Sequence, residues 1–287
     1  MLPLVDWPLA ARRNIIGVFT DIDDTLTTDG AITPDALQAL HDLKAEGFAV
    51  IAITGRPVGW SEPFAAEWPV DCIVAENGAV ALFKNDYLRK SDYLPARNMR
   101  GVLSKSYQTD VATRERNYAH LQHVLTRIER EVQGANRSTD SAGRETDIAI
   151  DHSEFTHLPP EKISEVVEMM QSEGLQATVS SIHINGWIGL HNKLQGAHWI
   201  VSELFGRDLA QEMNRWAYVG DSTNDQLMFE AFENSIGVAN IAGFLPELKA
   251  LPRYLADLDR GAGFAEVAAL LSKSSLESGS GKRNSRP

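Results

Sequence analysis

The sequence predicts an α/β protein with a doubly wound, mostly parallel sheet that is interrupted by an inserted α+β domain. Short apolar runs that end abruptly in polar turns alternate with helical patterns near both ends of the chain. A stretch with a different order of elements, helix-strand-helix-strand-strand, separates these two parts. We therefore expect a discontinuous core of residues 1–84 and 189–271, an insert of residues 85–188 and a disordered tail of residues 272–287.

The first part of the core begins with a strand at residues 15–20, because the run IIGVFT is apolar without alternation, as in a strand covered on both faces. A helix is expected next, because Thr33 can cap its start and Pro34 suits its first turn. Apolar residues at helical spacing follow, and Gly47 is expected to end the helix. Two further buried runs predict strands at residues 48–53 and 72–75. This β-α-β alternation implies parallel strands with right-handed crossovers.

The insert and the second part of the core follow from the same reasoning. In the insert we expect helices at 115–132 and 160–174 and strands at 146–150, 177–180 and 181–188. The core pattern then resumes with helices at 193–205 and 264–271 and strands at 216–220 and 236–239. Linkers are expected near Phe83–Asp86 and Gly189–Asn192. The tail carries six serines, two glycines and no apolar periodicity, which is typical of disorder.

Composition excludes several classes of function. Lys and Arg total 27 against 39 Asp and Glu, a net charge of −12, and such an acidic chain lacks the basic surface that nucleic acids need. A single cysteine, Cys72, rules out an intrachain disulfide and fits a reducing compartment. The longest apolar run, residues 48–53, is far shorter than the ~20 residues of a membrane span. We expect a cytoplasmic protein that binds neither nucleic acid nor membranes; no oligomeric state is indicated.

Polar side chains follow the expected strands at the points where they end. Asp21 and Asp23 follow the first strand, Thr54 follows the second, and Asp221 and Asp225 follow the strand at 216–220. Ligands of open parallel sheets bind beyond the carboxyl ends of the strands, so these groups should converge with Lys193, which opens a helix. Four carboxylates at one edge would repel strongly unless a cation lay among them.

These segments, DIDDT, TGR, ENGA, NKLQGA and GDSTND, resemble in order and spacing the haloacid dehalogenase superfamily. The likeness is greatest to its subclass with a large α/β cap, which includes Cof-type, sucrose-phosphate and mannosyl-3-phosphoglycerate phosphatases. It covers residues 15–84 and 188–271. The resemblance implies a Mg²⁺-dependent phosphatase that hydrolyses a small phosphate ester, a sugar or polyol phosphate, through an aspartyl-phosphate intermediate.

The resemblance also implies roles for individual residues. Asp21 would be the nucleophile, and Asp23 would protonate the leaving oxygen and then activate water. Thr54 and Lys193 would act in catalysis by holding the phosphoryl oxygens. Mg²⁺ would be held by Asp21, the backbone carbonyl of Asp23, Asp221 and Asp225, the last directly or through water. The predicted phosphate- and substrate-binding residues are Thr54, Gly55, Arg56, Asn77, Lys193 and Asn224.

For the other candidate substrate contacts, a functional and a structural interpretation both stay open. Arg56 could reach the substrate or form an ion pair that pins its loop. Four residues of the insert are candidate contacts to the leaving group, with a structural role as the alternative for each: Arg144, Asp147, His183 and Asn185. His191 and Trp187 are most simply packing residues.

A different enzyme class shares the same phospho-aspartate chemistry. A hexose phosphomutase would pass the phosphoryl group to a second hydroxyl, and a product assay separates it from a phosphatase. Asp23 argues for phosphate-ester chemistry, because dehalogenases of the superfamily lack an acid at that position.

Overall fold

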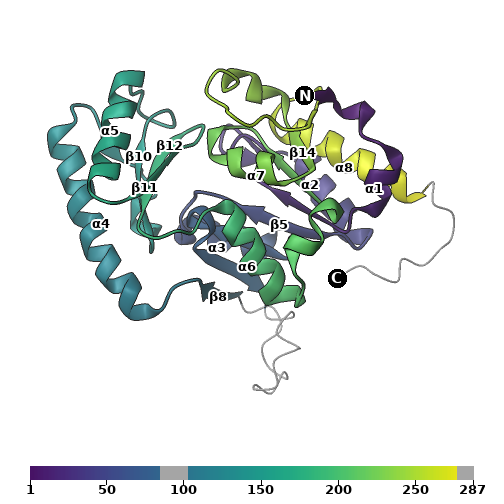
Figure 1. Cartoon of the computed structure of the whole chain (residues 1–287), viewed down its shortest axis with the longest axis horizontal. Coiled ribbons are helices and arrows are strands. Elements are labelled where there is room, and N and C mark those ends of the chain that lie inside the picture. The colour runs from purple at the N-terminus through teal and green to yellow at the C-terminus, as the bar shows by residue number, and fades with distance from the viewer. Residues whose placement is uncertain (85–102, 277–287) are drawn as a thin grey trace, which may run out of the picture.

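The structure is a computed structural model that describes residues 1–84 and 103–276 (Figure 1). Its largest element is a nine-stranded sheet, built from β1 (Leu2–Pro3), β2 (Gly17–Thr20), β5 (Ala49–Ile53), β6 (Cys72–Ala75), β7 (Val80–Lys84), β8 (Leu103–Tyr107), β13 (Trp216–Gly220), β14 (Asn234–Gly237) and β15 (Tyr254–Leu255). The strand order is β1-β15-β14-β13-β2-β5-β6-β7-β8. In this order, neighbouring strands from β1 through β6 run parallel to one another, whereas β7 runs antiparallel to β6 and β8 runs antiparallel to β7. The predicted mostly parallel sheet is confirmed.

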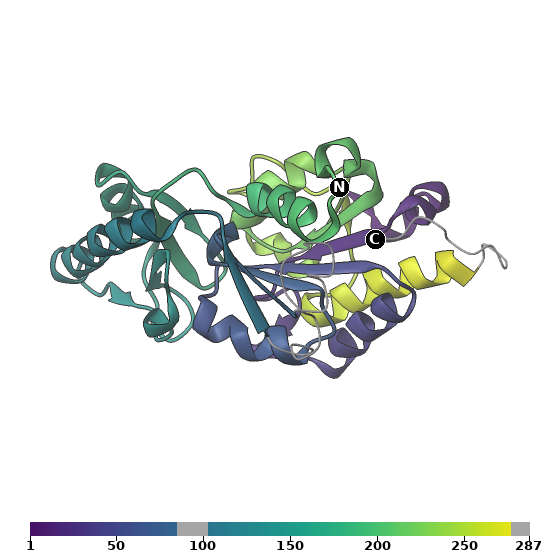
Figure 2. The same cartoon turned by 90° about the horizontal axis from the view of Figure 1, so that it is seen from below.

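Helices cover both faces of this sheet (Figure 2). One face packs against α2 (Pro34–Ala45), α3 (Val58–Glu67) and α8 (Arg260–Leu276), with α1 (Leu9–Asn14) beside α8. The other face packs against α6 (Lys193–Phe205) and α7 (Gln226–Ala231). Side chains of β5 alternate between the faces: Val50 and Ala52 join the first core, and Ile51 and Ile53 join the second. The continuous apolar runs of the sequence thus reflect a sheet buried on both sides.

A second, smaller sheet carries the cap, defined here as residues 111–187. Its strands lie in the order β11 (Gln176–Val179), β12 (His183–Trp187), β10 (Asp147–Asp151) and β9 (Asn136–Arg137), all antiparallel. The helices α4 (Val111–Glu131) and α5 (Pro160–Ser172) lie on the side of this sheet away from the core (Figure 1). Ile148, Ile150 and Ile184 pack beneath these helices. Because side chains alternate along a strand, the intervening residues of β10 and β12 face the core.

One strand of the large sheet lies inside the range predicted as the insert. β8 pairs with β7 along its whole length, and Leu103 and Tyr107 pack against the core of the large sheet. The run LSKSY has too little apolar character to be recognised as a strand from sequence. The chain therefore enters the cap after β8 rather than at the predicted linker near Phe83–Asp86, whose last two residues lie outside the described part.

The chain ends also differ from the prediction. The final helix, predicted at 264–271, spans Arg260–Leu276, so that residues 272–276 are helical rather than part of a disordered tail. Arg12 of α1 donates to Ser274 Oγ at 2.9 Å and thereby holds the last turn. The rest of the predicted tail, 277–287, lies outside the described residues. None of the helices in the described part is long and apolar enough to cross a membrane.

Candidate active site

Asp21 lies directly after β2, at the carboxyl edge of the large sheet, and is 3% exposed. Its Oδ1 accepts a hydrogen bond from Nζ of Lys193 at 2.5 Å. Lys193 is the first residue of α6, whose start is fixed by Asn192, since its side chain accepts from Gln195 N at 2.9 Å. The same Nζ donates to Asp225 Oδ1 at 2.6 Å. One buried ammonium group thus bridges the carboxylates that follow two neighbouring strands.

Asp225 organises the loop after β13. Its Oδ1 also accepts from the Tyr218 hydroxyl, and its Oδ2 accepts from the backbone N–H of Asp221 at 2.9 Å and of Ser222 at 3.2 Å. With Lys193 these are four donors, about as many as a carboxylate can accept. Asp225 is therefore better suited to holding Lys193 and the loop than to direct coordination of a metal.

The acidic cluster fits a hard cation. Oxygen atoms of Asp21, Asp221 and Asp225 lie within 4.8 Å of one another. Asp221 Oδ2 accepts from Asn240 Nδ2 at 3.0 Å, whereas its buried Oδ1 has no hydrogen-bond partner in the described part of the chain. Burial raises the pKa of Asp21 to about 8, although Lys193 opposes the shift, and burial with the neighbouring acids raises the pKa of Asp221 well above its ordinary value. A divalent cation with oxygen ligands would offset this repulsion.

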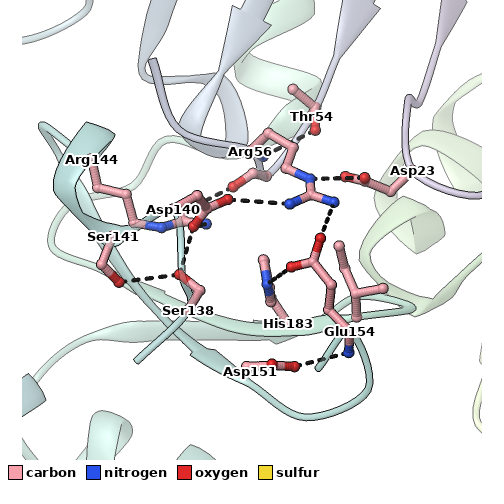
Figure 3. A network of polar contacts seen from close by, with 12 residues as sticks. Asp23, Thr54, Arg56, Ser138, Asp140, Ser141, Arg144, Asp151, Glu154 and His183 are labelled. Atoms are coloured by element: carbon pink, nitrogen blue, oxygen red, sulfur yellow. Dashed lines mark hydrogen bonds and ion pairs between the residues drawn. The ribbon is translucent and has the colours of Figure 1, made fainter. Parts of the chain in front are cut away.

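Asp23 lies beside a residue that connects the core to the cap (Figure 3). Nε of Arg56 donates to Asp23 Oδ1 at 2.8 Å. The two other guanidinium nitrogens donate to cap residues, Nη1 to Asp140 at 3.3 Å and Nη2 to Glu154 at 2.8 Å. The guanidinium also lies over the ring of Trp60. The ion pairs that the sequence left open as one interpretation of Arg56 are present, and a contact of Arg56 with substrate stays a prediction.

The turn after β5 supplies the next group of predicted residues. Thr54 is fully buried, and its Oγ1 accepts from the backbone N–H of Arg56 at 3.0 Å. Gly55 presents its carbonyl to the cap, where it accepts from Arg144 Nη1 at 3.0 Å and Asn185 Nδ2 at 3.3 Å. Asn77 contributes a backbone N–H that donates to the Thr54 carbonyl at 2.9 Å. These turns therefore hold one another in place.

The buried carboxylate of Glu76 joins the turn after β6 to the cap. Glu76 accepts from the backbone N–H of Val58 at 3.1 Å, of Glu145 at 2.9 Å and of Thr146 at 2.5 Å. Burial raises the pKa of Glu76, and these donors oppose the shift. Glu76, Asn77 and Gly78 all have left-handed backbone, with φ of 49°, 56° and 107°. Such a run is costly and persists only where the surroundings enforce it.

The four cap candidates all lie on the face of the cap that meets the core. Arg144 and Asp147 form a buried ion pair at 2.8 Å, and burial raises the pKa of Asp147 to about 8 despite the arginine. Asn185 lies beside the same pair, with its Nδ2 3.5 Å from Asp147. His183 pairs with Glu154 through Nε2 and Oε2 at 2.8 Å. The structure thus brings them to the site, where their observed contacts are with the protein itself.

The remaining predicted residues line a cavity of about 330 Å³ between the cap and the core. Asn224 lies on its wall, with Oδ1 accepting from Ser222 Oγ at 3.1 Å, and Lys193 also lines it. His191 and Trp187 form another part of the wall, where the indole donates to the His191 carbonyl at 2.8 Å. Both are buried, in agreement with the predicted packing role.

Sequence reasoning missed several residues of the site. Asn240 follows β14 and could have been found by the rule that identified Asp21 and Thr54, since it too lies after a strand of the parallel sheet. Tyr218 lies within an apolar strand and gives no polar signal. Three further residues, Glu76, Asp140 and Glu154, are common surface types whose burial depends on how the cap docks.

Comparison with known proteins agrees with this geometry. The profile of the haloacid dehalogenase-like hydrolase family matches residues 18–251. A protein of Streptococcus pyogenes serotype M6 with the name "Putative phosphatase" is 22% identical over 278 residues, which is 87% of this chain and 96% of the relative.

Two solved structures share the fold over nearly the whole chain. The Thermoplasma acidophilum protein 0175 has a TM-score of 0.66 and 17% identity over 90% of this chain and 98% of its own. The sucrose-phosphatase of Synechocystis sp. PCC6803, solved with sucrose and phosphate, has a TM-score of 0.61 and 16% identity over 89% of this chain and 97% of its own. The resemblance noted from the motifs is confirmed: the chain is an enzyme that belongs to the haloacid dehalogenase-like hydrolase family.

Proposed function

We propose that the protein is a Mg²⁺-dependent phosphatase of the cytoplasm that hydrolyses a small phosphorylated metabolite of the sugar phosphate or polyol phosphate class. The observation that carries the proposal is the buried contact between Asp21 and Lys193 beside an oxygen of Asp221 that no described residue partners. The likeness to a sucrose-phosphatase supports the sugar or polyol class.

Asp21 would be the nucleophile. One of its carboxylate oxygens would form a bond to phosphorus while the bond from phosphorus to the ester oxygen breaks, which leaves an aspartyl-phosphate. A carboxylate is a weak nucleophile, so the reaction depends on neutralising the phosphoryl oxygens. Lys193 and the Thr54 hydroxyl would supply part of that charge and hydrogen bonding. Mg²⁺, held by Asp21, Asp221 and the carbonyl of Asp23, would neutralise the remaining charge.

Asp23 would move the protons of both half-reactions. It would give a proton to the departing ester oxygen, which leaves as the free alcohol, and would then accept one from the water that attacks the aspartyl-phosphate. Arg56 contacts Oδ1 of Asp23 and thereby orients the side chain. The cap would exclude bulk water during these steps, since it already contacts Gly55, Arg56 and Glu76.

The test is a screen of sugar, polyol and glycerate phosphates, with release of inorganic phosphate as the readout in the presence and absence of Mg²⁺. We expect Mg²⁺-dependent release, reversibly abolished by EDTA, with greatest activity on a sugar or polyol phosphate. Release that persists in EDTA would contradict the metal assignment. Phosphoryl transfer to a second hydroxyl that requires a bisphosphate activator, without phosphate release, would instead indicate a phosphomutase.

A further inference from the structure

A second cavity, of about 490 Å³, opens beside Asp23. Its wall includes Asp23, Arg56 and Trp60 of the core and Glu154 and Phe155 of the cap. An acid that protonates the leaving oxygen must touch that oxygen, so the rest of the leaving group has to lie on the open side of Asp23. Asp23 does not line the cavity of about 330 Å³ next to Lys193. The cavity beside Asp23 is therefore the better candidate for the leaving group.

Acidic side chains dominate the wall of this cavity. Asp23, Asp24, Asp29 and Glu154 line it, against the two cations Arg56 and Arg260. Arg260 pairs with Asp24 at 3.1 Å and with Asp29 at 3.2 Å. Arg56 pairs with Asp23 and Glu154 at 2.8 Å and also with Asp140. Among the described lining residues, Arg56 is thus enclosed by three carboxylates and the partly exposed Arg260 lies beside two, so that acids outnumber cations at the wall.

Glu154 is held in place by its own loop. The side chain of Asp151 accepts hydrogen bonds from the backbone N–H groups of Ser153 at 3.1 Å, Glu154 at 2.9 Å, Phe155 at 2.9 Å and Thr156 at 3.0 Å. The Glu154 carboxylate is fixed in addition by Arg56 and His183. The loop therefore presents a preorganised acceptor rather than a mobile surface acid.

Resting on the phosphatase function proposed above, we propose that this cavity takes a neutral, hydroxyl-bearing leaving group and rejects leaving groups that carry a carboxylate, with Glu154 as the specificity-determining residue. Carboxylate oxygens accept hydrogen bonds from hydroxyl groups and repel another carboxylate across a partly desolvated cavity. The 72% exposed Phe155 adds an aromatic face for the C–H groups of a polyol or sugar, next to Trp60, whose ring lies under Arg56.

The experiment uses two phosphates that differ only at the far end of the carbon chain. Sorbitol 6-phosphate ends in a hydroxymethyl group and 6-phosphogluconate in a carboxylate. Each is tested as a competitive inhibitor of aryl phosphate hydrolysis by the full chain with Mg²⁺, so that the comparison does not require either to be turned over. We expect sorbitol 6-phosphate to bind more tightly by roughly tenfold, the effect of one screened charge in a partly buried site.

Two variants test the assignment to Glu154. The preference is measured as the inhibition constant of 6-phosphogluconate divided by that of sorbitol 6-phosphate. Glu154→Gln should lower this ratio by roughly tenfold. Phe155→Arg places a cation at an exposed position of the cavity wall and should also lower this ratio, because the cation attracts the carboxylate of 6-phosphogluconate. The matched control is Glu168→Gln, which removes the same charge from an exposed position of α5 and should leave the ratio unchanged.

The possible failures are distinguishable. An absence of aryl phosphate hydrolysis, with Mg²⁺ present and the chain folded, would overturn the proposed function. Hydrolysis with equal inhibition by the two compounds, or with no inhibition by either, would overturn the assignment of the cavity alone. A preference for sorbitol 6-phosphate that neither Glu154→Gln nor Phe155→Arg reduces would show that another part of the site sets it.

Discussion

Arg56 donates from Nε to Oδ1 of Asp23 at 2.8 Å, and this single core arginine also reaches two acids of the cap. The guanidinium fork allows three carboxylates to be held at once, which a lysine cannot reproduce with fixed directions. The position of the proposed acid–base residue is thereby coupled to contacts that exist only when the cap lies against the core.

Replacing Arg56 should uncouple these groups. Arg56→Met leaves Asp140 and Glu154 without their shared cation and Asp23 without its orienting donor. We expect kcat on an alkyl phosphate to fall about 100-fold, the scale of a misplaced catalytic group. An aryl phosphate, whose leaving group needs less protonation, should lose less.

The control for this change is Lys105→Met. Lys105 also connects the core to the segment before β10, through Glu62 and Glu145 at 3.0 Å, but at the surface. Exposed ion pairs contribute little, so its steady-state rates should stay close to those of the wild type. Similar losses in both variants, or equal losses on alkyl and aryl substrates in Arg56→Met, would contradict a role in orienting Asp23.

Lys193 should be required for turnover rather than for folding alone. Lys193→Met removes the cation between Asp21 and Asp225, and we expect kcat to fall roughly 10²- to 10³-fold, as for other preorganised groups that stabilise charge in the transition state. Lys44→Met is the comparison variant, because Lys44 pairs with the buried Asp71 at 2.5 Å away from the site. It should lower the free energy of unfolding while kcat of the folded fraction stays unchanged. Equal kcat in Lys193→Met and the wild type would refute the assignment.

Gly78 is expected to control where α6 begins. A Cβ at Gly78 would lie 2.4 Å from the carbonyl oxygen of Asn192, the cap of α6, and the residue also has φ of 107°. Gly174→Ala is the matched control, since it has φ of 84° but open space around the added carbon. Both substitutions carry backbone strain of about 1–3 kcal/mol. Only Gly78→Ala should exceed that cost and also lower kcat, because it displaces Lys193. Urea unfolding and steady-state rates check this, and indistinguishable unfolding free energies would contradict the close contact.

His191 should make stability depend on pH. Burial lowers its pKa from 6.5 to about 4, so between these values the unfolded chain binds a proton that the folded chain does not. The free energy of unfolding therefore falls as the pH falls through this window, and we expect His191 to account for about 2 kcal/mol of the loss between pH 7.5 and pH 5. His191→Phe keeps a ring beside Trp187 and should reduce the loss by that amount. An unchanged pH dependence in the variant would show that His191 does not titrate in this way.

The parts of the protein that were predictable from sequence are those determined by local pattern. Asp21, Thr54 and Asp221 each follow a continuous apolar strand, and in a parallel sheet the ends of such strands meet at one edge. The alternation in β10 and β12 likewise places Asp147, His183 and Asn185 on one face of the cap. Both relationships follow from strand geometry alone.

What could not be predicted depends on the docking of distant segments. The partners of Arg56 lie 33, 84 and 98 residues away along the chain, and two of them are ordinary surface acids by composition. The contact between Gly59 and Gly143, where an added Cβ would lie 2.9 Å from a backbone atom, depends in the same way on how the cap approaches α3. β8 was missed because its sequence is too polar to indicate a strand, and its partner β7 supplies the pairing.

In the proposed mechanism Asp21 carries the phosphoryl group during turnover. Acid-quenching of the Asp23→Asn variant during reaction with an aryl phosphate and Mg²⁺, followed by peptide mass spectrometry, would detect that group. This variant retains the nucleophile but should hydrolyse the intermediate slowly, so the phosphoenzyme accumulates. We predict one added phosphoryl group on the peptide that contains Asp21, and none when Asp21→Asn is introduced as well. A phosphoryl group on any other residue, or turnover by Asp21→Asn at more than a few per cent of the wild-type rate, would show that Asp21 is not the nucleophile.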